Sequence, residues 1–277
     1  MQPSAGERHR IRPLAAASRY LRLLWVQLRT SSLLALQYRY DFLIEGGISL
    51  LYTITALAPL WVIFERREDV VGWSFAEALL VVGWFTLLQG VLEGAINPSL
   101  TTVVEHIRKG TLDFVLLKPV DSQFLVSTAK FLPWRIGNVV SAIVIFVYAF
   151  ERVGWPAPGA VAEAALLFAC AIAVLYSLWI IIVSAAFYVV KVDNLTYLFA
   201  SIFDAARWPI GIFRGFLSLL FTFIIPLALM TTFPAQALLG TLELRTLLSS
   251  VAGSLAFVVA SRWIWLLAIR GYTSASS

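Results

Sequence analysis

The sequence predicts an all-α membrane protein with six transmembrane helices, and composition and hydropathy carry that prediction. Of its 277 residues, 60% are hydrophobic and 13% are charged, about half the ~25% of charged residues in soluble domains. The mean hydropathy is +0.84. Six stretches are apolar enough, over about 20 residues, to cross a bilayer. Each must satisfy its own backbone hydrogen bonds, so each is expected to be a helix.

A basic segment, residues 1–40, precedes the first span. Between residues 14 and 29, Trp25 shares one helical face with leucines, while Arg19, Arg22 and Arg29 cluster on another. Such a helix lies in the headgroup plane with its arginines toward anionic lipid. We therefore expect an amphipathic elbow helix at the membrane interface. It acts either as an anchor alone or also as a contact for a cytoplasmic partner.

One transmembrane domain, residues 41–270, follows, and residues 271–277 form a cytoplasmic tail. The predicted spans are residues 42–64, 75–96, 133–150, 160–190, 216–232 and 247–267. Lys and Arg favour the cytoplasmic side of a membrane. With the N-terminus inside, seventeen Lys and Arg residues fall in inner segments, including residues 191–214, against four in outer segments. Both termini are therefore expected in the cytoplasm.

The connection after the second span predicts a cytoplasmic helix over residues 98–109. Asn97 and Pro98 form a start signal, and Gly110 is a stop signal. The apolar residues of this helix repeat at helical spacing, whereas its charged residues fall on the other side. These residues, with the acid that follows the helix, are Leu100, Val104, Glu105, Ile107, Arg108, Lys109 and Asp113. Docking to a partner and resting on lipid are equally compatible with this pattern.

Two further segments are candidates for structure at the membrane. Residues 231–240 contain Phe233, Pro234 and Gln236 and close on a glycine. They predict a short re-entrant helix that could line the outer mouth of a pathway. In the preceding inner connection, residues 195–206 predict a short helix on which Asp204 and Arg207, three apart, can pair as a surface ion pair.

Few charged residues lie inside the spans. Glu93 is near the inner end of the second span, where pairing with Arg135 or Arg214 is favoured over a role in the pathway. The Gly90–Gly94 spacing permits close helix contact. Since no chain of acidic residues crosses the membrane, an ion-driven carrier is disfavoured.

The sequence lacks the motifs of several classes of enzyme and ATP-binding protein. It contains no G-x-x-x-x-G-K-[ST], H-E-x-x-H or G-x-S-x-G pattern. His9, His106 and Cys170 make no metal set. Nothing resembles a nucleic-acid-binding module. The chain is therefore expected to be neither an enzyme nor an ATP-hydrolysing protein by itself.

The loop that begins at Arg108 reads R-K-G-T-L-D-F-V-L-L-K-P. It is similar to the R-x-G-x-L-D-x-x-L-L-x-P stretch of one branch of the ABC-2-type ABC transporter permeases. The elbow helix, the re-entrant segment and the six spans also resemble that family. The resemblance extends over essentially the whole chain, and the family's members carry no catalytic residues.

The resemblance implies the membrane subunit of an exporter in a bacterial plasma (inner) membrane. Two permease subunits, identical or paralogous, would form the pathway, and a cytoplasmic ATPase would bind ATP and Mg²⁺. Residues 98–109 and the loop motif would be the coupling element, with the apolar side of the helix packed on the ATPase or the membrane base. An ATPase-independent secondary carrier and a non-transporting membrane scaffold are the alternatives.

Overall fold

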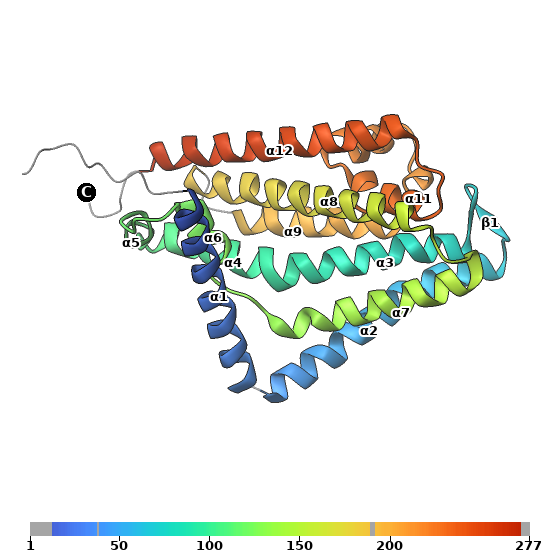
Figure 1. Cartoon of the computed structure of the whole chain (residues 1–277), viewed down its shortest axis with the longest axis horizontal. Coiled ribbons are helices and arrows are strands. Elements are labelled where there is room, and N and C mark those ends of the chain that lie inside the picture. The colour runs from blue at the N-terminus through green and yellow to red at the C-terminus, as the bar shows by residue number, and fades with distance from the viewer. Residues whose placement is uncertain (1–12, 38, 189–191, 273–277) are drawn as a thin grey trace, which may run out of the picture.

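The computed structural model describes residues 13–37, 39–188 and 192–272, which are mostly helical. Its long helices lie side by side in one bundle, with α1 running crosswise at one end (Figure 1). Among the described residues, five helices are long and apolar enough to cross a membrane. The number is six if one bent pair of helices counts as a single span.

The elements follow one another along the chain with short connections. They are α1 (Pro13–Gln37), α2 (Arg39–Glu65), β1 (Asp69–Val70), β2 (Trp73–Ser74), α3 (Phe75–Val91), η1 (Leu92–Ile96), α4 (Asn97–Arg108), α5 (Asp113–Leu116), α6 (Ser122–Ser127), η2 (Pro133–Arg135), α7 (Ile136–Val153), α8 (Pro158–Ser184), η3 (Ala185–Phe187), α9 (Val192–Phe203), η4 (Asp204–Arg207), η5 (Ile210–Ile212), α10 (Phe216–Leu219), η6 (Leu220–Ile224), η7 (Ala228–Thr232), α11 (Phe233–Leu238) and α12 (Leu244–Arg270).

Strands β1 and β2 form a small antiparallel hairpin at one end of the bundle, which we call the hairpin end. Val71 and Gly72 make the turn with φ of 52° and 77°, the positive values that a tight hairpin turn needs. Ser74 then starts α3 through a capping box with Glu77. The opposite end, where α1, α4 and α6 lie, is called the basic end.

Helix α3 packs closely against α7 through glycines. A Cβ atom at Gly83 would lie 2.7 Å from the ring of Phe146, and one at Gly90 would lie 3.0 Å from Asn138 Cβ. Gly94 likewise faces Arg135. The predicted close contact at Gly90 and Gly94 is therefore confirmed, and Gly83 extends it.

The course of residues 191–214 differs from the prediction. The described part begins at Val192 and runs from the basic end along the bundle (Figure 1). Phe203 stacks near Phe85 of α3, with centroids 5.3 Å apart, and Gly211 lies against Val71 of the hairpin. The prediction that this whole segment is a connection on the inner side is therefore wrong. Its apolar face is buried against α3 and α8 instead of resting on the membrane surface.

The predicted span over residues 216–232 is not one straight helix. Residues Phe216–Ile224 and Ala228–Leu238 meet at an angle of 67°. Pro226 lies at the bend, where its missing N–H and its ring interrupt the helix. In the second half, Thr231 donates a hydrogen bond to the Ala206 carbonyl at 2.7 Å, and Thr232 Oγ1 accepts one from the Ile210 N–H. The bent pair therefore packs beside η4 and η5, toward the hairpin end.

Candidate functional site

Helix α4 is a continuation of the span before it, not a separate helix. The π-helical turn η1 joins α3 to α4, and the Asn97 side chain caps no helix start. Pro98 has no N–H for the Gly94 carbonyl four residues earlier. The N–H of Leu132 donates to that carbonyl instead, at 2.8 Å. The predicted start signal at Asn97 is therefore wrong, and a neighbouring chain segment satisfies the carbonyl that proline leaves free.

The apolar side of α4 is covered by this chain itself. Leu100 and Val104 are buried in the core, as is Val103, while Ile107 is half-buried and packs against that core. The prediction that Leu100 and Val104 contact an ATPase or the membrane base is therefore wrong for this conformation. Their burial fixes the helix to the bundle, so movement of α4 must move the spans with it.

The charged side of α4 faces outward at the basic end. Glu105, Arg108 and Lys109 are exposed, and Glu105 pairs with Lys109 at 3.4 Å. Gly110, with φ of 66°, closes the helix in a Schellman motif, in which the Thr111 N–H reaches the His106 carbonyl. The predicted stop at Gly110 is confirmed. The role of these residues in ATPase coupling stays a prediction.

The short helix α5 presents an exposed apolar pair that the sequence reading did not single out. Asp113 begins this helix, and the buried Leu112 anchors it. Phe114 is 70% exposed and Leu117 is 81% exposed. The available signal was the run of four apolar residues between Asp113 and Lys118, in a loop outside every predicted span. Together with the charged side of α4, the Phe114 and Leu117 side chains form what we call the α4–α5 face.

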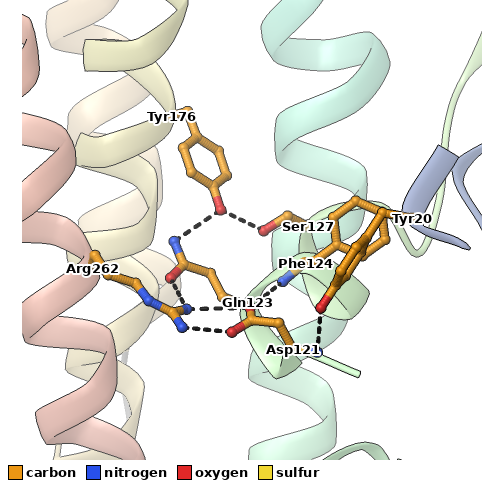
Figure 2. Close-up of polar contacts among 7 residues, drawn as sticks. All are labelled: Tyr20, Asp121, Gln123, Phe124, Ser127, Tyr176 and Arg262. Atoms are coloured by element: carbon orange, nitrogen blue, oxygen red, sulfur yellow. Dashed lines mark hydrogen bonds and ion pairs between the residues drawn. The ribbon is translucent and has the colours of Figure 1, made fainter. Parts of the chain in front are cut away.

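Helix α6 is tied to two membrane-spanning helices by a polar cluster, which we call the α6 clamp (Figure 2). Asp121 caps α6 by accepting the Phe124 N–H at 3.0 Å, and it also receives Arg262 of α12 at 2.5 Å and 3.2 Å. Arg262 donates to Gln123 as well, at 2.8 Å. Gln123 in turn donates to the Tyr176 hydroxyl of α8 at 3.0 Å. The segment that contains α6 is thereby linked to α8 and α12.

The charge of Arg262 affects the acid in this clamp. Partial burial raises the pKa of Asp121, but the hydrogen bond from Arg262, the Phe124 N–H and the positive charge of Arg262 outweigh it. The pKa of Asp121 therefore lies below its usual value. Asp121 is ionised at neutral pH, so the ion pair is formed there.

Helix α1 lies against the loop that contains α6. The Tyr20 ring meets the Phe124 ring edge-on at 4.8 Å, and the Tyr20 hydroxyl accepts the Asp121 N–H at 3.4 Å (Figure 2). Arg19 donates to the Pro119 carbonyl at 2.5 Å. Of the other predicted interface residues, Arg22, Trp25 and Arg29 are exposed. One face of α1 thus contacts this chain, while the other is open to lipid or solvent.

The two predicted ion pairs occur at one polar cavity of about 560 Å³. Glu93 pairs with Arg135 at 2.5 Å, and Asp204 pairs with Arg207 at 3.0 Å. Of the two partners considered for Glu93, Arg135 is therefore correct. The predicted Asp204–Arg207 pair is confirmed, with the Asp204 side chain 54% exposed, and both residues line this cavity between α2, α3 and η4.

The residues predicted at the outer mouth lie far along the bundle from the α4–α5 face. Pro234 is buried, and Phe233 and Gln236 are half-buried, at the start of α11. Phe233 borders a cavity of about 340 Å³ beside the first turns of α12. The predicted site residues therefore fall into separate groups at the two ends of the spans.

These features define a class before any relative is considered: a multi-pass helical membrane protein with a folded platform at one end of its spans and a polar cavity between them. The family model of the ABC-2 family transporter proteins matches residues 50–276. The chain belongs to that family, whose members are transmembrane permease subunits. No curated protein and no solved structure matches the chain.

Proposed function

We propose that this chain is the permease subunit of an ATP-driven exporter. Two permease subunits, identical or paralogous, form the pathway, and a separate cytoplasmic ATPase binds ATP and Mg²⁺. The observation that carries the proposal is the α4–α5 face. It combines the exposed charges of α4, a helix continuous with a span, with the exposed Phe114 and Leu117 of the α5 segment that follows it. Membership of the ABC-2 family supports an ATPase as the partner.

The orientation follows from charge. The described ends of the chain, at α1 and α12, lie at the basic end (Figure 1). Lys and Arg concentrate at the cytoplasmic side of membrane proteins. We therefore place the basic end, with both termini, in the cytoplasm, and the hairpin end outside a bacterial inner membrane.

Two segments acquire membrane roles in this orientation. Helix α1 crosses the bundle direction (Figure 1) and exposes Leu21 and Trp25 beside its arginines, which suits an elbow helix in the headgroup layer. The bent pair of Phe216–Ile224 and Ala228–Leu238 enters the outer leaflet and returns, as a re-entrant segment. Phe233, Pro234 and Gln236 then border the outer part of the pathway.

Coupling in this proposal runs through two routes. Closure of the ATPase pushes the α4–α5 face, and the continuous helix from α4 through η1 to α3 carries the movement into the membrane. The α6 clamp carries it to α8 and α12 through Arg262 and Tyr176. Exposed charge pairs contribute little affinity, so the charges of α4 set the register of docking while Phe114 and Leu117 supply apolar contact.

The test is charge reversal on α4. The double variant Arg108→Glu, Lys109→Glu is co-expressed with the ATPase that co-purifies with the wild-type chain, and ATP hydrolysis is measured in proteoliposomes. We expect membrane insertion to be unchanged and coupled hydrolysis to fall about tenfold, the effect of about 1.4 kcal/mol of lost interaction. Arg66→Glu, an exposed reversal near the hairpin end, is the matched control and should leave hydrolysis unchanged.

Two results would contradict the proposal. Normal ATP hydrolysis in the double variant would show that α4 is not part of the docking surface. Flux of substrate by the chain alone under an ion gradient, with no ATPase bound, would make it a secondary carrier.

A further inference from the structure

The polar cavity lies deep among the spans. Arg207 lies over the ring of Phe85, with its guanidinium carbon 5.2 Å from the ring centroid. Phe85 is ten residues into α3, which at 1.5 Å per residue is about 15 Å from the start of that helix. Placing the edge of the hydrocarbon layer, which is about 30 Å thick, at the capped start of α3 puts the Asp204–Arg207 pair near the middle of the membrane. The Glu93–Arg135 pair borders the same cavity toward the basic end.

The charged groups of the cavity are not fully satisfied within this chain. The Asp204 side chain is 54% exposed, although it lies at membrane depth. Nε of Arg135 is buried and has no hydrogen-bond partner among the described residues. Charged groups at this depth are costly unless they face water, protein or a polar ligand, and they mark functional sites. The exposed oxygen and the unpartnered N–H therefore call for a polar occupant.

The balance of charge defines the chemistry of that occupant. Each pair contributes one carboxylate and one guanidinium, so the cavity has no net charge. A simple anion or cation would meet as much repulsion as attraction. A headgroup with both signs can place its anionic part toward a guanidinium and its cationic part toward a carboxylate. The volume of about 560 Å³ is within the range of sites for small molecules.

An apolar cavity continues the polar one toward the hairpin end. Its volume is about 320 Å³, and its walls include Leu60, Phe64 and Trp208. Leu60 is one helical turn beyond Ala56, which borders the polar cavity, and Trp208 directly follows Arg207. The two cavities are therefore neighbours between α2, α3 and residues 200–213, and we call the two together the groove. A ligand with a polar head and an apolar tail matches that order.

We propose that this groove binds an amphipathic molecule with a zwitterionic headgroup. The headgroup lies between the Glu93–Arg135 and Asp204–Arg207 pairs, and the apolar part lies beside Leu60 and Trp208. The role of the groove as a site for a transported substrate rests on the proposed function. Its ability to bind an amphipathic molecule does not. The site is formed by residues of one chain, so it exists without a second permease copy.

The experiment measures binding by the purified full-length chain in a maltoside detergent, without ATPase. The probe is a phosphocholine lipid that carries a photoreactive diazirine in its acyl chain, and the comparison probe has an anionic phosphoglycerol headgroup. We expect saturable crosslinks in peptides containing Leu60 or Trp208. The phosphocholine probe should bind about tenfold more tightly than the anionic probe, because only its quaternary ammonium is attracted to the carboxylates of the cavity; tenfold corresponds to about 1.4 kcal/mol.

The variant Asp204→Asn tests the headgroup site directly. It leaves the cavity with a net positive charge, so the preference should move toward the anionic probe, which a purely structural defect would not produce. Arg207 keeps its hydrogen bond to the Asp204 backbone carbonyl, at 3.0 Å, so the fold is expected to persist. Glu163→Gln, which neutralises an exposed acid on α8, is the matched control and should keep the wild-type preference.

Competition separates the two sources of such a ligand, and both results support the class. A single-chain phosphocholine detergent that competes better indicates a soluble amphiphile, and a two-chain lipid that competes better indicates a membrane lipid. Equal crosslinking of both probes, crosslinks confined to the lipid-facing surface of α12, or an unchanged preference in Asp204→Asn would overturn the inference. If no ATPase co-purifies with the chain from its native membranes, the proposed function fails, whereas specific crosslinking in detergent would still establish the binding site.

Discussion

Neutralising Asp121 isolates the strength of the α6 clamp. Asn is as good a helix cap as Asp, so Asp121→Asn keeps the bond to the Phe124 N–H and removes the ion pair with Arg262. The Arg262 and Asp121 side chains are 41% and 32% exposed, which places the pair between an exposed ion pair of about 0.2–1 kcal/mol and a hydrogen bond to a buried charge of about 1.5–3 kcal/mol. We expect a coupling free energy of about 1–2 kcal/mol between Asp121 and Arg262.

Hydrogen exchange measures this free energy locally. The N–H groups of Phe124, Leu125 and Thr128 are bonded within the α6 turn, and their exchange reports opening of that turn. Asp121→Asn should speed exchange in residues 121–130 about tenfold, the effect of about 1.4 kcal/mol. Arg262→Gln should have a similar effect, and the double variant should add little.

The matched control is another ion pair at the same end of the bundle. Glu105→Gln breaks the exposed Glu105–Lys109 pair and should change exchange in residues 121–130 by less than twofold, because such pairs contribute about 0.3–0.5 kcal/mol. If Asp121→Asn changes exchange no more than this control, or if the effects of Asp121→Asn and Arg262→Gln simply add, the reasoning about the clamp is refuted.

Three further predictions concern packing and pH. Gly83→Ala should lower the thermal stability of the detergent-purified chain, because the new methyl group would lie 2.7 Å from Phe146, and overpacking costs about 1–3 kcal/mol; Gly137→Ala, with open space around it, should leave stability equal or higher. Leu100→Ala should destabilise the chain by about 2–5 kcal/mol, and a neutral effect in a thermal-shift assay would mean that Leu100 is not buried. The pKa of Asp121 is lowered in the folded chain, so the ion pair of the clamp stabilises the fold above the usual pKa near 3.8 and this stabilisation is lost as the pH falls below it. The protection of residues 121–130 against hydrogen exchange, corrected for intrinsic exchange rates, should therefore stay constant from pH 8 to pH 5. A loss of protection within that range would contradict the ion pair.

The long spans were predicted well from the sequence, because a run of about twenty apolar residues is typical of a transmembrane helix and of few other structures. The fifth crossing was predicted over residues 216–232, but in the structure it begins with α9. That helix has twelve residues and continues into Asp204 and Arg207, so its pattern is typical of a polar connection. Leaving Arg207 out of the count and moving Arg214 to the outer side gives fifteen inner basic residues against five outer ones, so the orientation does not depend on this error.

The candidate site was predicted in part, and the errors have a common origin. Helical spacing showed that Leu100 and Val104 share a face, but spacing does not say what covers that face. Asp121 and Arg262 are 141 residues apart, so no local pattern links them. Glu93 and Arg135 were paired correctly because each lies near the same predicted end of a span, where an isolated charge needs a partner.

The central claim is that these spans are driven by a separate ATPase. The most direct measurement purifies the full-length chain from its native membranes, identifies the bound ATPase and reconstitutes both in proteoliposomes. The account predicts ATP hydrolysis that requires both proteins and falls when Arg108 and Lys109 are reversed. ATP hydrolysis that is indifferent to the chain, or substrate flux by the chain alone, would contradict it.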